Sequence, residues 1–271
     1  MTGTAEDIVR QATAAFNAGR RDEARRLCEQ GLAQEPGEAM LSHLLAAVLF
    51  AAGEFQPARA HIETSLVSRP DSAPAQLLAG RIARRLGDFD AALVYLDRAL
   101  ALAPQREALF EKARTLDAAG VRPQARDAWG AILKALPQDR EAAARLGRLA
   151  WEDGEYATAV SLLERATSGE APASVWFDLG VVHQDLRDYA EATKAYRKAL
   201  DIKPDYAEAA LNLGTALQES GDLDGAMRAY ADAYRLRPDV FGTIAMALTS
   251  APHGRLWLDE AALRRALKLR T

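Results

Sequence analysis

Proline recurs along this chain at a nearly constant interval, and glycine recurs in step with it. The prolines lie 33 or 34 residues apart, with one gap of 67, at Pro36, Pro70, Pro104, Pro137, Pro204 and Pro238. The glycines lie at Gly19, Gly53, Gly87, Gly120, Gly154 and Gly221, and Arg187 stands in the remaining slot. A period of roughly 20–50 residues indicates a stack of similar structural units. The spacing therefore predicts seven repeats.

Each unit is predicted to be a pair of helices joined by a tight turn at the glycine. The proline ends the second helix, because it lacks an N–H group and fixes φ. Helices of about 12–15 residues are marginal alone in water. Each pair must therefore bury its apolar stripe against the next pair. The units are predicted to begin at Ala5, Ala39, Ala73, Arg106, Arg140, Ala173 and Ala207.

The sixth and seventh units carry the most complete motif. The sixth contains Trp176, Leu179, Gly180, His183, Ala192, Tyr196, Ala199 and Pro204. The seventh contains Leu213, Gly214, Leu217, Ala226, Tyr230, Ala233 and Pro238. This pattern resembles the tetratricopeptide (TPR) repeat, and the resemblance covers residues 5–240 in about seven tandem copies. It implies an all-α fold, a right-handed α-solenoid of helix-turn-helix TPR repeats with a C-terminal capping helix.

Residues 241–271 break the period, so we expect a TPR solenoid over residues 1–240 and a helical cap over 241–271. A first helix is predicted over residues 241–249. A last helix is predicted over residues 260–269, with Asp259 as its N-cap and Leu263 and Leu267 on its inner face. Such a cap would cover the exposed end of the solenoid.

The residues that could contact a partner form a stripe on the first helix of each unit. Numbered from the start of a unit, positions 4, 7, 8 and 11 share the core face. Positions 2, 5, 6, 9, 12 and 13 lie on another face, which the TPR resemblance places in a concave, peptide-binding groove. In the first two units this stripe is apolar, with Val9, Phe16, Leu44, Ala47 and Phe50. In the last two it is acidic, with Asp178, Asp185, Glu208 and Glu219.

The stripe is basic in the third to fifth units, and its residues are the predicted peptide-binding site: Arg81, Arg84, Arg85, Phe110, Arg114, Arg145, Arg148 and Trp151. Arg81, Arg114 and Arg148 occupy position 9 of consecutive units, so they are expected to stack as a ladder. Residues 73–148 carry 13 basic and 9 acidic groups, whereas residues 149–240 carry 9 basic and 17 acidic groups. The formal net charge of −4 therefore conceals a polarised chain.

Two interpretations of the ladder remain open. In one, Glu107, Glu111, Asp117 and Glu141 neutralise the arginines within the protein. In the other, the planar guanidinium groups bind acidic side chains, a terminal carboxylate or a phosphate of a partner. We then expect Arg114→Glu to abolish partner binding without lowering thermal stability.

The favoured function is a non-catalytic scaffold that binds an acidic or carboxylate-bearing peptide segment of a protein partner. One alternative is a self-assembling structural protein, a homo-oligomer built head-to-tail with Leu256, Trp257 and Leu258 as an apolar patch. Another is an accessory module that recruits substrates for an enzyme encoded elsewhere. The lysine and asparagine clamp of chaperone-binding TPR proteins is absent from these positions, as is the asparagine ladder of glycosyltransferase-linked ones.

The sequence gives little support for a disulfide, a metal site, catalysis or nucleic-acid binding. Cys28 is the single cysteine and the four histidines are scattered, so neither a disulfide nor a metal site is expected. Motifs for phosphate binding or hydrolysis are missing, which predicts a protein without enzyme activity and without cofactors. The pI near 5.7 argues against nucleic-acid binding. We expect a cytoplasmic protein with no membrane association.

Overall fold

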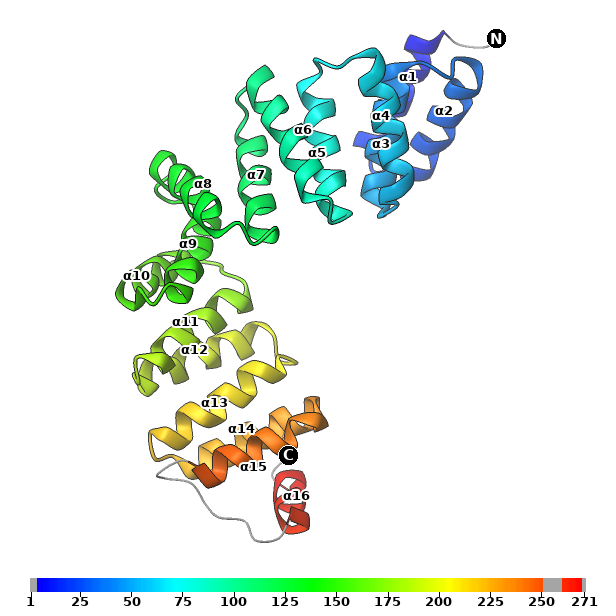
Figure 1. The fold of residues 1–271 in the computed structure, drawn as a ribbon. Helices are drawn as coiled ribbons and strands as arrows, with labels where there is room; N and C mark the ends of the chain where they lie inside the picture. Colours follow the sequence, from blue (N-terminus) through cyan, green and yellow to red (C-terminus); the bar gives the residue numbers. More distant parts are fainter. Residues whose placement is uncertain (1–3, 251–259, 270–271) are drawn as a thin grey trace. The chain divides into compact units, whose positions relative to one another are not determined.

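The structure is a computed structural model that describes residues 4–250 and 260–269. Within these ranges the chain forms sixteen α-helices and one short 3₁₀ helix, and no strand (Figure 1). The predicted all-α architecture is confirmed. No helix in the described ranges is long and apolar enough to cross a membrane.

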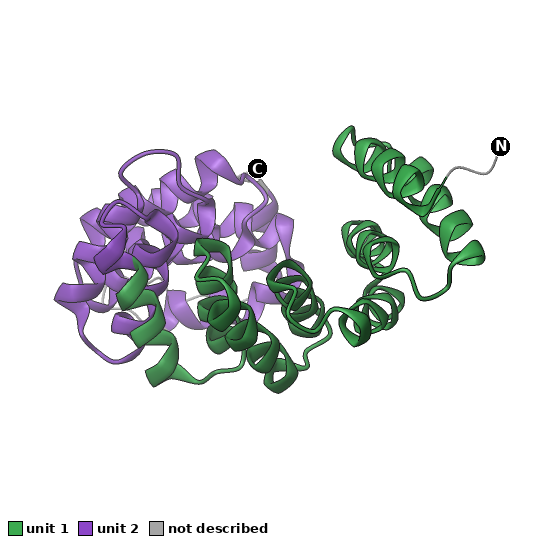
Figure 2. Ribbon diagram, turned by 90° about the horizontal axis from the view of Figure 1, so that it is seen from above, with its two compact units in different colours: residues 1–132 green, residues 133–271 purple. Residues whose placement is uncertain are grey.

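The helices fall into two compact units, residues 1–132 and 133–271, which Figure 2 colours separately. The first unit contains α1 (Ala5–Asn17), α2 (Arg21–Gln34), α3 (Ala39–Ala52), α4 (Phe55–Ser68), α5 (Ala73–Arg85), α6 (Phe89–Leu102), α7 (Arg106–Ala118) and most of α8 (Arg122–Ala135). The second contains α9 (Arg140–Glu152), α10 (Tyr156–Ala166), α11 (Ala173–Asp185), α12 (Tyr189–Ile202), α13 (Ala207–Glu219), α14 (Leu223–Leu236), η1 (Pro238–Val240), α15 (Phe241–Ser250) and α16 (Glu260–Leu269).

A helix begins at each of the seven residues where a unit is predicted to start. The turn between the two helices of a pair adopts positive φ. Its glycines have φ between 71° and 91°, a region in which a side chain is strained. In the sixth pair Arg187 takes the same position with φ 59°.

Two positions on the second helix are buried in every pair. Position 20, on the second helix, is alanine in all seven repeats, and all seven alanines are fully buried: Ala24, Ala58, Ala92, Ala125, Ala159, Ala192 and Ala226. Position 24, one turn further, is also buried in every repeat and is occupied by Cys28, Ile62, Leu96, Trp129, Leu163, Tyr196 and Tyr230. Small side chains let the helix backbones approach, and the larger ones fill the space between them.

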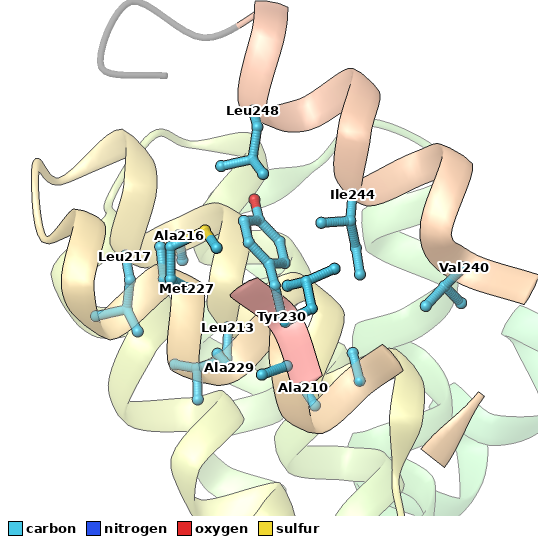
Figure 3. Packing of buried hydrophobic residues seen from close by; sticks show 14 of the residues in the cluster. Ala210, Leu213, Ala216, Leu217, Met227, Ala229, Tyr230, Val240, Ile244 and Leu248 are labelled. Carbon is cyan, nitrogen blue, oxygen red and sulfur yellow. The ribbon is translucent and has the colours of Figure 1, made fainter. Parts of the chain in front are cut away.

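The C-terminal helices continue the core of the second unit. Ile244 and Leu248 of α15 lie in one buried cluster with Tyr230 of α14 (Figure 3). Leu263 and Leu267 of α16 are buried in the same cluster, and α16 packs on α14. The helices expected over residues 241–249 and 260–269 are thus present. Asp259 and the patch of Leu256, Trp257 and Leu258 lie outside the described residues.

Candidate functional site

The first helices of successive repeats lie side by side in the first unit. Helix α1 packs beside α3, α3 beside α5, and α5 beside α7. Equivalent positions on these helices are therefore neighbours, and the predicted stripe forms one surface from α1 to α7. Its basic part lies on α5 and α7.

Three arginines of this stripe converge on one buried carboxylate. Glu111 of α7 has a side chain only 5% exposed. Its Oε1 accepts a hydrogen bond from Nη1 of Arg114 at 3.0 Å and lies 3.4 Å from Nε of Arg81. Its Oε2 accepts a hydrogen bond from Nε of Arg84 at 3.1 Å. We call Arg81, Arg84, Arg114 and Glu111 the arginine cluster.

The arginine cluster has more hydrogen-bond donors than Glu111 can accept. A carboxylate offers about four acceptor positions, whereas each guanidinium carries five N–H donors. Glu107, a second carboxylate near the cluster, lies 3.7 Å from Arg81 and is 69% exposed. The side chains of Arg81, Arg84 and Arg114 keep 24–34% of their surface exposed. Glu111 thus holds three guanidinium groups in place while part of each faces solvent.

Aromatic rings support the neighbouring cations. Phe110 is buried and meets Trp129 of α8 edge-on, with ring centroids 6.0 Å apart. The guanidinium of Arg114 lies 5.8 Å from the Phe110 ring centroid. That of Arg85 lies 4.6 Å from the Phe55 ring centroid. Phe110 therefore acts as a support beneath the cluster, and Phe55 is a participant that the sequence stripe did not include.

The remaining predicted residues lie in the second unit. Arg145 and Arg148 of α9 line a cavity of about 380 Å³ together with Arg140 and the start of α11. Three carboxylates line it too: Glu141, Glu170 and Asp178. The cavity is thus of mixed charge. Burial raises the pKa of Asp178, and the charges of Arg148 and Arg145 oppose that rise.

Trp151 makes a specific contact between two repeats of the second unit. Its Nε1 donates a hydrogen bond to Oδ2 of Asp185, at 2.7 Å. The two residues hold positions 12 and 13 of consecutive repeats, so the period could have indicated that they lie near each other, but the hydrogen bond itself is seen only in the structure. Arg148 forms an ion pair with Glu152 at 3.4 Å. Because Arg148 and Arg114 belong to different units, their stacking stays a prediction.

In the part of the chain that the structure describes, no geometry supports metal binding or a reactive thiol. Among the described residues, no three His, Cys, Asp or Glu side chains are grouped so that they could hold a metal ion. Cys28 is fully buried in α2, and burial raises the pKa of its thiol to about 12. A neutral, enclosed thiol is a poor nucleophile.

Sequence profiles of the tetratricopeptide repeat match residues 15–82, 73–106, 110–175 and 171–239. The BBSome complex member BBS4 of Mus musculus is 31% identical over 104 residues, which are 38% of this chain and 20% of that protein. The matched stretches make up only 15–20% of the lengths of the curated relatives.

Solved structures share the fold at lower identity. PilW, a type IV pilus biogenesis factor, is 19% identical with a TM-score of 0.65, over 80% of this chain and all of that one. YrrB, a TPR protein with an unusual peptide-binding site, is 19% identical with a TM-score of 0.54, over 67% of this chain and 95% of that one. The profile matches run through nearly all of the helix pairs described above, and the chain belongs to the tetratricopeptide repeat family.

Proposed function

We propose that this protein is a non-catalytic interaction scaffold, and that it captures an acidic or carboxylate-bearing segment of a protein partner at the arginine cluster. The observation that carries the proposal is the convergence of Arg81, Arg84 and Arg114 on the buried Glu111. YrrB, which shares the fold, is described as a peptide-binding TPR protein. That description is consistent with the proposal.

The geometry of the arginine cluster favours binding of a carboxylate for two physical reasons. Arginine presents a planar fork of donors that matches a carboxylate. Ion pairing to Glu111 also restricts the guanidinium groups before a ligand arrives, which lowers the conformational entropy lost on binding. A charge-assisted hydrogen bond at a partly desolvated site contributes about 1.5–3 kcal/mol.

The proposal is tested with the full-length protein and two fluorescein-labelled 12-residue probes, poly-glutamate and poly-glutamine. Fluorescence anisotropy should show binding of poly-glutamate alone, weakening as sodium chloride screens the charges. Arg81→Gln should reduce the affinity about tenfold, equivalent to about 1.4 kcal/mol. Arg84 and Arg114 still pair with Glu111 in this variant, so the fold is retained.

Arg59→Gln is the matched control. Arg59 lies on α4, is 38% exposed and pairs with Glu63 and Asp88, so its loss removes a charge and two ion pairs away from the arginine cluster. It should leave the affinity for poly-glutamate unchanged. The proposal is overturned if poly-glutamine binds as well as poly-glutamate, or if Arg59→Gln and Arg81→Gln weaken binding equally.

A further inference from the structure

The surface that carries the arginine cluster continues into an apolar surface on the same unit. Val9 and Phe16 of α1 and Ala47 and Phe50 of α3 are half-buried side chains at the edge of the core. We call these four residues the apolar stripe. Because α1, α3 and α5 lie side by side, the apolar stripe runs directly up to Arg81 and Arg84.

Equivalent positions change character at one step of the repeat. Position 12 is Phe16, Phe50 and then Arg84 in the first three repeats. Position 9 is Ala47 in the second repeat, Arg81 in the third and Arg114 in the fourth. A ligand that lies across equivalent positions of neighbouring repeats therefore meets apolar side chains on α3 and cationic side chains on α5.

Direct contacts connect the two surfaces. The rings of Phe50 and Phe55 lie 5.6 Å apart, centroid to centroid. Phe55 lies at the start of α4, and the guanidinium of Arg85, on α5, lies 4.6 Å from the centroid of its ring. Phe50, Phe55 and Arg85 thus form a continuous chain from the apolar stripe to the basic end of α5.

His43 does not add a cation to the apolar side. It lies on α3, half-buried, at position 5 of the second repeat. Burial lowers the pKa of its imidazole, and the charge of Arg69 lowers it further. The imidazole is therefore neutral at pH 7 and adds no positive charge beside the apolar stripe.

We infer that the partner segment is bipartite, with one or two large apolar side chains that contact the apolar stripe and an acidic group that contacts the arginine cluster. This inference rests on the proposed function for its acidic half. Packed helices lie about 8–10 Å apart, so one or two steps along the stack span about 10–20 Å. An extended chain rises about 3.3 Å per residue, so the apolar and acidic groups are separated by about three to six residues.

The inference is tested with a fluorescein-labelled peptide that contains two phenylalanines, a four-residue Gly-Ser spacer and three glutamates. Matched peptides replace Phe by Ser, replace Glu by Gln, or remove the spacer. The parent peptide should bind the full-length protein at least about tenfold more tightly than each matched peptide, a difference of about 1.4 kcal/mol. Ala47→Gln should weaken binding of the parent peptide and leave the Ser-substituted peptide unaffected.

Ala60→Gln, at an exposed position on α4, is the matched control and should change neither affinity. If the Ser-substituted peptide binds as tightly as the parent and the Gln-substituted peptide does not bind, acidic capture stands and the bipartite inference is overturned. If the Gln-substituted peptide binds as tightly as the parent, the acidic capture of the proposed function is overturned. Equal weakening by Ala47→Gln and Ala60→Gln overturns the assignment of the apolar stripe.

Discussion

The ring of Tyr230 occupies the space that a side chain on Gly214 would need. A Cβ atom at Gly214 would lie 2.5 Å from Cδ1 and Cε1 of the ring, closer than such atoms can approach. Gly180 and Tyr196 repeat this relationship one unit earlier, again at 2.5 Å. Glycine at position 8 therefore allows a buried tyrosine at position 24, and the two positions act as one packing unit.

Gly214→Ala should lower the free energy of unfolding by about 1–3 kcal/mol, because the added methyl group overpacks the core against Tyr230. Thermal or urea unfolding followed by circular dichroism measures the effect. Gly130→Ala is the control, since a Cβ atom at this position of α8 meets nothing within 4 Å. It should raise stability by up to about 1 kcal/mol through helix propensity. Equal effects of both substitutions would refute the close packing.

Arg187→Gly should stabilise the protein by up to about 1 kcal/mol. Arg187 has φ 59°, where an L-residue costs about 1–2 kcal/mol and glycine does not. Part of this gain is offset by the greater entropy that glycine loses on folding. Arg187→Ala retains the strained φ and should leave the melting temperature nearly unchanged. A melting temperature that rises equally for both variants would assign the effect to the arginine side chain.

Stability should fall as pH rises above about 10, partly through Tyr230. Burial raises the pKa of its hydroxyl to about 12 in the folded protein, from 10.0. The unfolded chain therefore loses this proton first. The contribution is fully present below pH 10 and is lost by about pH 12, amounting to roughly 2–3 kcal/mol. Tyr230→Phe should flatten this part of the curve of unfolding free energy against pH. An unchanged slope in the variant would contradict the assignment.

Cys28 should react with a thiol reagent such as DTNB only as the protein unfolds. The thiol is fully buried, and its pKa of about 12 leaves very little thiolate at pH 8. The rate should be negligible in buffer and rise sharply through the urea unfolding transition. Rapid labelling in buffer, at the rate of a free thiol, would show that α2 opens locally.

Arg114→Glu should lower stability more than Arg114→Gln, by at least about 1 kcal/mol, because it sets a second carboxylate beside the buried Glu111. This differs from the expectation drawn from the sequence, in which reversal of this charge leaves stability unchanged. The comparison of the two melting temperatures measures the effect. Identical melting temperatures would indicate that the side chain of residue 114 turns away from Glu111.

The repeat itself was predictable because its signals are local. Proline ends a helix and glycine permits positive φ wherever they stand in the chain. The helices accordingly begin at all seven expected residues, from Ala5 to Ala207. Alanine at position 20 and a buried residue at position 24 also recur with the period. The helices expected over residues 241–249 and 260–269 lie outside the period and were indicated by their own apolar spacing; the structure has them at Phe241–Ser250 and Glu260–Leu269.

The contacts of the candidate site were decided only by the tertiary structure. The sequence offers four carboxylates to the arginines, and packing of α5 beside α7 brings Arg81 and Arg84 together on Glu111, with Glu107 also within 3.7 Å of Arg81. Packing of Trp129 against Phe110 likewise buries a ring that the sequence presented as an anchor for a ligand. The helical period determines which face of a helix a residue occupies. Which side chains on adjoining faces meet depends on how neighbouring helices pack, and a local pattern does not contain that information.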